Sequence, residues 1–146
     1  MIKKIFSLII IVQIFCSVAQ AAINKIAIVD VQKVVNKSSQ IQALKREQEN
    51  KRKELAQFIK KAGEDIKKQP DEAKKKAIAQ KYDKELKAKQ EANAKAYKTK
   101  LEAADKNINS IIIQQAKAMG YDIVLAKGVV LYGGDDITES ILKVIK

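Results

Sequence analysis

The sequence predicts an α+β protein in which a long antiparallel helical hairpin, a coiled-coil arm, projects from a small body of β-strands. Three observations support this fold class. The middle of the chain is rich in Lys, Ala, Gln and Glu, its single proline lies almost halfway along, and short β-prone segments occupy both ends. We therefore expect residues 22–39 and 120–146 to form the body and residues 40–119 to form the arm.

The first 21 residues predict a cleavable signal peptide. Two lysines precede a mostly apolar stretch, residues 5–18, and the sequence AQA at residues 19–21 fits a cleavage site. The apolar stretch is short for a transmembrane helix, although an uncleaved anchor is the alternative. Cys16 follows a bulky Phe, whereas a lipoprotein site would have a small residue there. We expect an exported protein whose mature chain begins near Ala22 and has no cysteine.

The positive charge is concentrated in the predicted arm. The whole chain has a formal net charge of +12, and residues 40–119 contain 21 Lys or Arg against 12 Asp or Glu. The chain has no histidine, and its only cysteine belongs to the signal peptide, so the common metal ligands and the usual general base are missing. Because no nucleophile or phosphate-binding motif is present either, we expect a protein that is not an enzyme and needs no cofactor or metal.

The N-terminal part of the body begins with a predicted strand at residues 25–29. Asp30 is a preferred cap residue and is expected to start a short helix at Val31. Ser39 and Gln42 have the spacing of a capping box, which predicts that the first arm helix begins here and continues to residue 69.

Pro70 predicts the tip of the arm. A proline inside a helix removes a hydrogen bond and clashes with the preceding turn, and it also disfavours helical backbone at the residue before it. Asp71 and Glu72 then place negative charge at the start of the next helix, where the helix dipole favours it. This second helix is predicted to run from residue 71 to 119 and to end at Gly120.

Residues at equal distances from Pro70 should meet along the hairpin. Most of these opposed pairs are apolar: Ala62 with Ile78, Phe58 with Tyr82, Leu55 with Leu86, Leu44 with Tyr97 and Ile41 with Leu101. The middle of this seam is polar, since Gln48 and Lys51 oppose Asn93 and Lys89. We expect the arm to bend at these four residues. A compact helical bundle is the alternative, but each helix has only one narrow apolar stripe.

The C-terminal part of the chain predicts a β-hairpin and a last helix. Residues 121–126 and 129–132 have strand character and are separated by a turn, while Asp136 and Glu139 form a second capping box. The base of the second arm helix, residues 103–119, becomes more apolar and should enter the body.

So small a body buries little apolar surface, which predicts that other subunits complete it. The expected body and subunit contacts are Ile26, Ile28, Val124 and Val130. A compact monomeric body is the alternative.

The two ends of the chain carry a resemblance to a known family. The segment KIAIVDVQKVV at residues 25–35, the basic arm, and the segment YDIVLAKGVVLYGGDDITESILKVIK at residues 121–146 resemble the Skp/OmpH family of periplasmic chaperones. The resemblance implies a homotrimer whose three arms enclose a cavity. It also implies that unfolded outer-membrane proteins are held there without ATP and kept soluble until insertion.

The arm contains residues that are not needed for the seam and are therefore expected to contact clients. The apolar ones are Ile59, Ile66 and Ala94, and the basic ones are Lys60, Lys67, Lys68, Lys74 and Lys75. The alternative for the apolar residues is ordinary packing within the hairpin. The basic arms should also be attracted to acidic clients and to anionic lipid or lipopolysaccharide surfaces.

Two other classes of function compete with a chaperone. A basic chain can bind nucleic acid, but the basic residues alternate with acidic ones, no aromatic platform accompanies them, and the export signal separates the protein from nucleic acid. A structural coiled-coil protein of the envelope is the other alternative. An aggregation assay distinguishes the two, since a chaperone suppresses aggregation of an unfolded outer-membrane protein and a structural coiled-coil protein does not.

Overall fold

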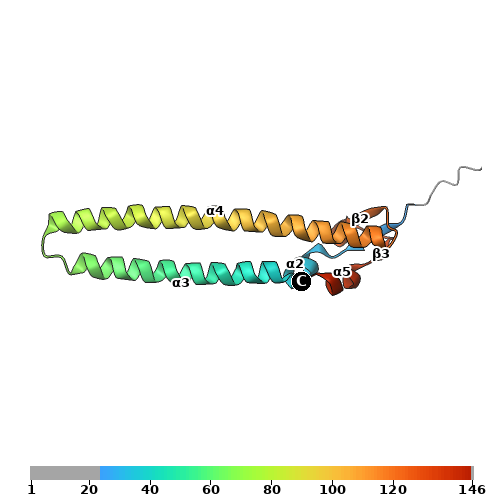
Figure 1. The fold of residues 1–146 in the computed structure, drawn as a ribbon, viewed down its shortest axis with the longest axis horizontal. Helices are drawn as coiled ribbons and strands as arrows, with labels where there is room; N and C mark the ends of the chain where they lie inside the picture. Colours follow the sequence, from blue (N-terminus) through green and yellow to red (C-terminus); the bar gives the residue numbers. More distant parts are fainter. Residues whose placement is uncertain (1–23, 146) are drawn as a thin grey trace, which may run out of the picture.

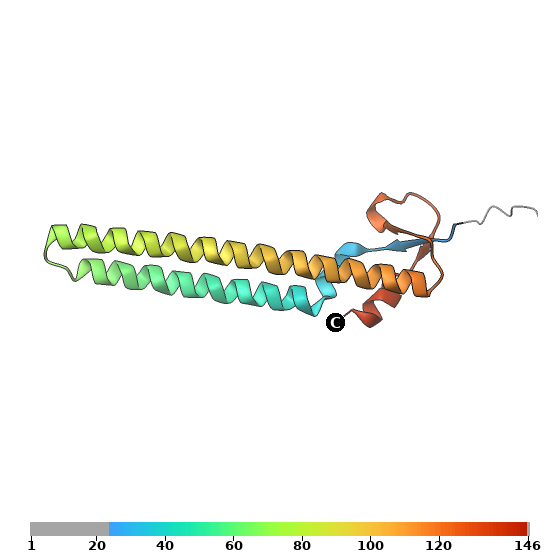
Figure 2. The same ribbon diagram turned by 45° about the horizontal axis from the view of Figure 1, so that its top comes forward.

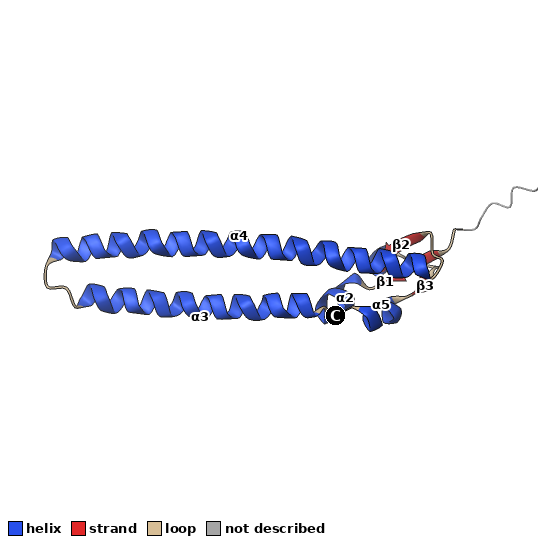
Figure 3. Ribbon diagram, viewed as in Figure 1, coloured by secondary structure: helices blue, strands red, loops and turns tan. Residues whose placement is uncertain are grey.

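The computed structural model describes residues 24–145, and the predicted signal peptide lies outside the described residues. Figure 1 shows two long antiparallel helices, with the remaining elements gathered at one end of the hairpin. The elements follow the order β1 (Ile26–Val29), α2 (Val31–Lys37), α3 (Ser39–Lys67), α4 (Glu72–Ala118), β2 (Ile123–Ala126), the short 3-10 helix η1 (Lys127–Val129), β3 (Asp135–Asp136) and α5 (Thr138–Val144). Figure 3 shows two helices joined by a loop in the arm, and strands only in the body.

The tip of the arm lies where Pro70 predicts it. α3 ends at Lys67 and α4 begins at Glu72, so the proline stands in the connection. The carboxylate of Asp71 caps α4 by accepting hydrogen bonds from the backbone N–H groups of Ala73 and Lys74, at 2.8 and 3.1 Å. At about 1.5 Å per residue, α3 is roughly 45 Å long, and α4 extends past its base into the body.

The helices of the arm meet in the predicted register. The rings of Phe58 and Tyr82 contact each other edge to face, with their centroids 5.4 Å apart. Farther from the tip, the side-chain amides of Gln48 and Asn93 face each other across the seam. These contacts confirm the pairing near the tip and at the centre of the arm. The pairs predicted nearer the base are not confirmed, because Tyr97 and Leu101 are exposed and Leu44 lies beside Lys100 and Ala104 instead.

The hydrophobic core lies in the body and at the base of the arm. Four residues of α4 at one-turn spacing, Ala104, Ile108, Ile112 and Ala116, are buried against β1, α2 and α5. Within the outer arm, by contrast, only Ala62 is buried. The base of α4 therefore enters the body as predicted, and the rest of the arm lacks a closed core. Figure 2 shows this division between the projecting hairpin and the body.

The predicted β-hairpin is wrong. The sheet has the order β2-β1-β3, and both outer strands run parallel to β1. Residues 130–132 form no strand beside β2, because the 3-10 helix η1 takes the place of the tight turn that a hairpin needs. Gly133 and Gly134 have positive φ angles of 83° and 85°, which turn the chain back toward β1.

The cap of α2 is confirmed, but the two predicted capping boxes are wrong. Asp30 caps α2 by accepting a hydrogen bond from Lys33 N–H at 2.9 Å. Ser38, rather than Ser39, precedes α3, and Gln42 donates to the carbonyl of Asn36 instead. At α5 the cap position is Ile137, and Glu139 forms an ion pair with Lys33 of α2 at 2.6 Å. Each pair is therefore replaced by a contact with α2, six residues away for Gln42 and 106 residues away for Glu139.

Candidate functional site: the groove along the arm

A groove runs along one flank of the arm between α3 and α4. Its central part has a volume of about 570 Å³, with Leu55 and Phe58 from α3 opposite Ala92 and Ala96 from α4. A second hollow of about 500 Å³ shares Phe58 and Lys61 with the first and continues to the tip. We call the two together the arm groove; it lies between residues 47–69 and residues 78–96.

Aromatic side chains join the two parts of the arm groove. Tyr82 packs against Phe58, and its hydroxyl donates a hydrogen bond to the Asp65 carboxylate, which raises the pKa of Tyr82 above its ordinary value. The ammonium of Lys89 lies 5.1 Å from the centroid of the Phe58 ring, within the range of a cation–π contact. These contacts connect the helices where aliphatic packing is thin.

The groove has an excess of unpaired positive charge. Lys51 is paired with Glu54 at 2.7 Å, and Lys89 lies 3.5 Å from Glu85. Three other lysines that line the groove have no carboxylate within 4.0 Å among residues 24–145; they are Lys61, Lys68 and Lys81. An acidic ligand would therefore find unpaired cations along the groove.

The four residues predicted to form a hinge lie at the centre of the arm. Gln48 and Asn93 exchange two long side-chain hydrogen bonds, at 3.3 and 3.4 Å. Asn93 also lines the groove together with Lys51 and Lys89. The four predicted hinge residues therefore lie along a part of the seam where the side-chain hydrogen bonds are long and the groove is hollow. Bending at this point stays a prediction.

The predicted apolar client contacts lie away from the groove. Ile59 is 53% exposed, Ala94 is exposed and Ile66 is half-buried. Each stands two residues from a groove-lining position, namely Lys61, Ala96 and Lys68 respectively. Two residues correspond to a rotation of about 160° around a helix, so these side chains point to the other flank of the arm.

Only one of the five predicted basic client contacts lines the groove. That residue is Lys68, whereas Lys60, Lys67 and Lys74 are exposed elsewhere on the arm. Lys75 is partly buried and forms an ion pair with Glu72 at 2.5 Å. Sequence reasoning missed the groove, although residues 47, 54, 61 and 68 recur every seven positions beside the seam and mark this flank of α3.

The predicted subunit contacts lie in the small sheet and the loop beside it. Ile26 and Ile28 belong to the central strand β1, Val124 belongs to β2, and Val130 follows η1. Ile28 is buried within its own subunit, and the other three are half-buried.

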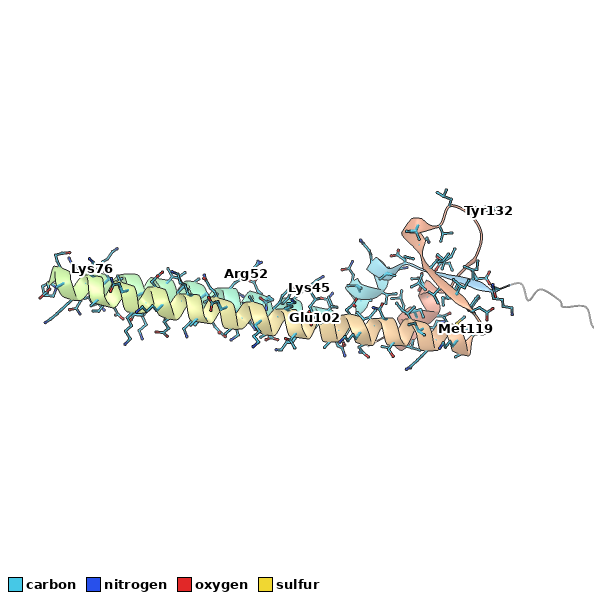
Figure 4. The ribbon with its side chains drawn as sticks, turned by 90° about the horizontal axis from the view of Figure 1, so that it is seen from above. Lys45, Arg52, Lys76, Glu102, Met119 and Tyr132 are labelled. Atoms are coloured by element: carbon cyan, nitrogen blue, oxygen red, sulfur yellow. The ribbon has the colours of Figure 1, made fainter. Side chains whose placement is uncertain are left out.

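A more exposed surface lies next to these residues, and we call residues 129–132 the apolar loop. Val129 is 73% exposed, and Leu131 and Tyr132 are almost completely exposed, at 103% and 98%. Figure 4 shows Tyr132 at the outer end of this loop, away from the arm. On the neighbouring strand β2, Ile123 and Leu125 are also exposed. Because large apolar side chains gather here, the body presents a surface suited to another protein chain.

A network of polar groups connects the loop region to the body. The Asp136 carboxylate accepts hydrogen bonds from Lys127 Nζ at 2.8 Å and from the backbone and hydroxyl of Thr138 at 3.0 and 2.5 Å. Lys127 and Thr138 together hold the pKa of Asp136 well below its ordinary value. The Thr138 hydroxyl oxygen in turn accepts a hydrogen bond from Asp30 N–H at 2.9 Å. These contacts join η1, β3, α5 and the start of α2, so the network holds the body together.

The described residues contain neither a metal site nor a membrane-spanning helix. Within residues 24–145, no three Asp, Glu, His or Cys side chains are grouped to hold a metal ion. In the same range, no helix is both long and apolar enough to cross a bilayer.

Comparison with known proteins places the chain in a family. The family model described as "Outer membrane protein (OmpH-like)" matches residues 25–145, which include the body and the whole arm. No curated protein sequence matches the chain. Members of the matching family are periplasmic chaperones that bind unfolded outer-membrane proteins. Since the match covers nearly all of the described residues, this chain belongs to the OmpH-like (Skp/OmpH) family.

Proposed function

We propose that this protein is an ATP-independent holdase of the periplasm, which shields unfolded outer-membrane proteins between basic helical arms. The observation that carries the proposal is the arm itself. It projects from the body as two helices whose outer part buries only Ala62, so nearly all of its surface is available to a partner. Its excess of lysines favours acidic clients through long-range attraction.

Physical chemistry supports a surface of this kind for unfolded β-barrel proteins. Such clients expose alternating apolar side chains and unpaired strand edges, which makes them prone to aggregate. A chamber that keeps two unfolded chains apart prevents aggregation without needing a tight site. Many weak contacts along a long arm also allow the client to leave, because no single contact holds it strongly.

The chamber requires more than one arm, and we propose a homotrimer assembled through the body. The exposed side chains of Leu131 and Tyr132 and the exposed face of β2 support this assembly. Covering them with a second copy would remove apolar surface from water, and each large side chain contributes about 1.5–3 kcal/mol when fully buried. The β2 edge is also open to another strand, since β2 pairs only with β1 in the described residues.

Charged substitutions in the apolar loop test the assembly. Leu131→Asp with Tyr132→Asp should dissociate the oligomer, because an unpaired charge in an interface is strongly destabilising. These positions are exposed in one subunit, so the subunit should keep its fold, as measured by circular dichroism. Ile28→Asp is a less clean test, since Ile28 is buried within its own subunit. A sedimentation profile that stays unchanged in the double variant would contradict the proposed interface.

Native mass measurement and an aggregation assay together test the function. The purified protein should suppress aggregation of an unfolded outer-membrane protein on dilution from urea, without any nucleotide. Native mass spectrometry should then detect three chains with one client. If the protein forms an oligomer but does not slow aggregation, it is a structural coiled-coil protein instead of a holdase.

A further inference from the structure

The arm groove has the length of one strand of a β-barrel. Along α3 and its C-cap it extends from Glu47 to Lys68, which corresponds to about 32 Å at 1.5 Å per residue. An extended chain advances about 3.3 Å per residue, so about ten residues fill this length. Strands of membrane barrels also contain about ten residues of alternating hydrophobicity.

The groove combines an apolar floor with unpaired cations. Leu55 and Phe58 lie in its central part, and Ile78 and Tyr82 line the part near the tip. Each of these four side chains is half-buried, so each still presents apolar surface to a ligand. An extended segment directs every second side chain to one face, which allows apolar groups to reach the floor while the alternate side chains remain in solvent.

The charge of the groove favours an acidic segment. Lys61, Lys68 and Lys81 line it without a carboxylate partner among the described residues, whereas the acidic groups Glu47, Glu54 and Glu85 already face lysines. The fourth carboxylate of the groove, Asp65, has no lysine partner and accepts the hydrogen bond of the Tyr82 hydroxyl, so three unpaired lysines stand against one carboxylate. Carboxylates flanking the apolar side chains of a ligand would therefore meet free ammonium groups.

From these observations we infer that the arm groove binds one extended, acidic-apolar segment of an unfolded polypeptide, and that this flank is the client-binding face of the arm. The inference rests on the proposed holdase function and adds the face and form of binding. It differs from the contacts expected at Ile59, Ile66 and Ala94, which point to the other flank.

Two alanines of α4 allow a direct comparison of the flanks. Ala96 lines the groove, and Ala94, two residues away, is exposed on the other side. A photo-crosslinking benzoylphenylalanine at either position changes no charge. In the presence of an unfolded outer-membrane protein, the variant at position 96 should crosslink to the client several-fold more than the variant at position 94. Equal yields, or a higher yield at position 94, would overturn the inference.

The aggregation assay separates this inference from the proposed function. If the protein suppresses aggregation but position 96 does not crosslink preferentially, the groove inference fails and the holdase function stands. If the protein does not suppress aggregation at all, the holdase function fails, and the groove inference fails with it.

Two triple variants with the same loss of charge test the role of the lysines. The groove variant carries Lys61→Gln, Lys68→Gln and Lys81→Gln, and the control carries Lys60→Gln, Lys67→Gln and Lys74→Gln, whose side chains lie outside the groove. The probe is a fluorescent ten-residue peptide of alternating Leu and Asp. The dissociation constant of the peptide should rise about tenfold for the groove variant, because three exposed ion pairs between peptide and groove are lost together. The control should change it by less than about twofold, because only general attraction is reduced.

Two results would overturn the assignment of the lysines. Equal weakening in both triple variants would mean that overall charge, and not the groove, determines binding. The same variants should also be tested with vesicles of phosphatidylglycerol and phosphatidylcholine. If the groove variant loses vesicle binding but keeps peptide binding, the lysines serve an anionic lipid surface.

Discussion

Replacement of the polar pair at the centre of the arm should stiffen it. Gln48 and Asn93 are half-buried and exchange hydrogen bonds of 3.3 and 3.4 Å, near the long limit for such bonds. The double variant Gln48→Leu with Asn93→Leu replaces this pair by an apolar contact in register with the rest of the seam. The arm should then bend less at this point.

The structure allows the size of this effect to be worked out. Full burial of a Leu contributes about 1.5–3 kcal/mol, and a half-buried position about half of that. Two long, partly solvated amide hydrogen bonds contribute about 0.5 kcal/mol each at most, and this contribution is lost. The net stabilisation should be about 0.5–2 kcal/mol, which lowers the population of the locally open state, and so slows exchange, by about 2- to 30-fold.

Native-state hydrogen exchange measures this change directly. In the wild-type protein, amides at residues 45–55 and 86–95 should exchange faster than those around the buried Ile108 and Ile112. In the double variant they should exchange more slowly, while the body is unchanged. Gln90→Leu is a matched control, since Gln90 is exposed and does not line the groove.

Uniformly slow exchange from base to tip of the wild-type arm would refute a hinge at its centre. Exchange in the double variant that is no slower than in Gln90→Leu would contradict the expected stiffening. A stiffer arm should reduce the capacity to hold clients most for large clients, which require the widest opening. That loss can be measured as the ratio of protein to client needed to suppress aggregation.

The remaining predictions concern the body and export. Lys127 and Thr138 lower the pKa of Asp136 in the folded state, so its contribution to stability is present above the ordinary value of 3.8 and is lost as the pH falls below it. Asp136→Asn should cost about 1 kcal/mol near pH 7 and less at about pH 3, measured by urea unfolding at fixed protein concentration; an equal cost at both pH values would contradict this. Gly134→Ala should destabilise the body by about 1–3 kcal/mol, because φ is +85° and the added Cβ would lie 2.9 Å from the Ile28 side chain. Gly128→Ala is the control, since a Cβ there meets nothing within 4 Å, and both can be compared by thermal unfolding. The exported protein should begin at or near Ala22 by intact-mass analysis, and retention of residues 1–21 would refute the predicted signal peptide.

Features that depend on neighbours in the sequence could be predicted without the structure. Pro70 ends one helix and precedes the next because its ring cannot be accommodated in a helix interior, wherever the segment lies. Asp71 caps α4 with its own carboxylate, and Gly120, with φ of +79°, follows the end of that helix. The register of the seam near the tip and at the centre also followed, because a short tip forces residues at equal distances from it to meet.

Features that depend on distant partners could not be predicted in this way. Strand propensity describes single residues, whereas β1 pairs with β2 almost a hundred residues later in the chain, at Ile26 and Ile123. The apolar loop has the composition of a strand but does not pair with β2, since η1 follows β2 in place of a tight turn. Glu139 similarly pairs with Lys33, 106 residues away in the chain, instead of with its predicted capping partner.

For the candidate site too, some features could be predicted from the sequence and others depend on how the two helices pack. The sequence by itself determined that the arm is basic, that its seam is polar at Gln48 and Asn93, and which residues are left outside the seam. It did not determine which flank of the arm is hollow, because that depends on how the two helices lie against each other. Small Ala92 and Ala96 opposite Leu55 and Phe58 leave a groove on one side, and only the packed structure distinguishes that side from the flank of Ile59.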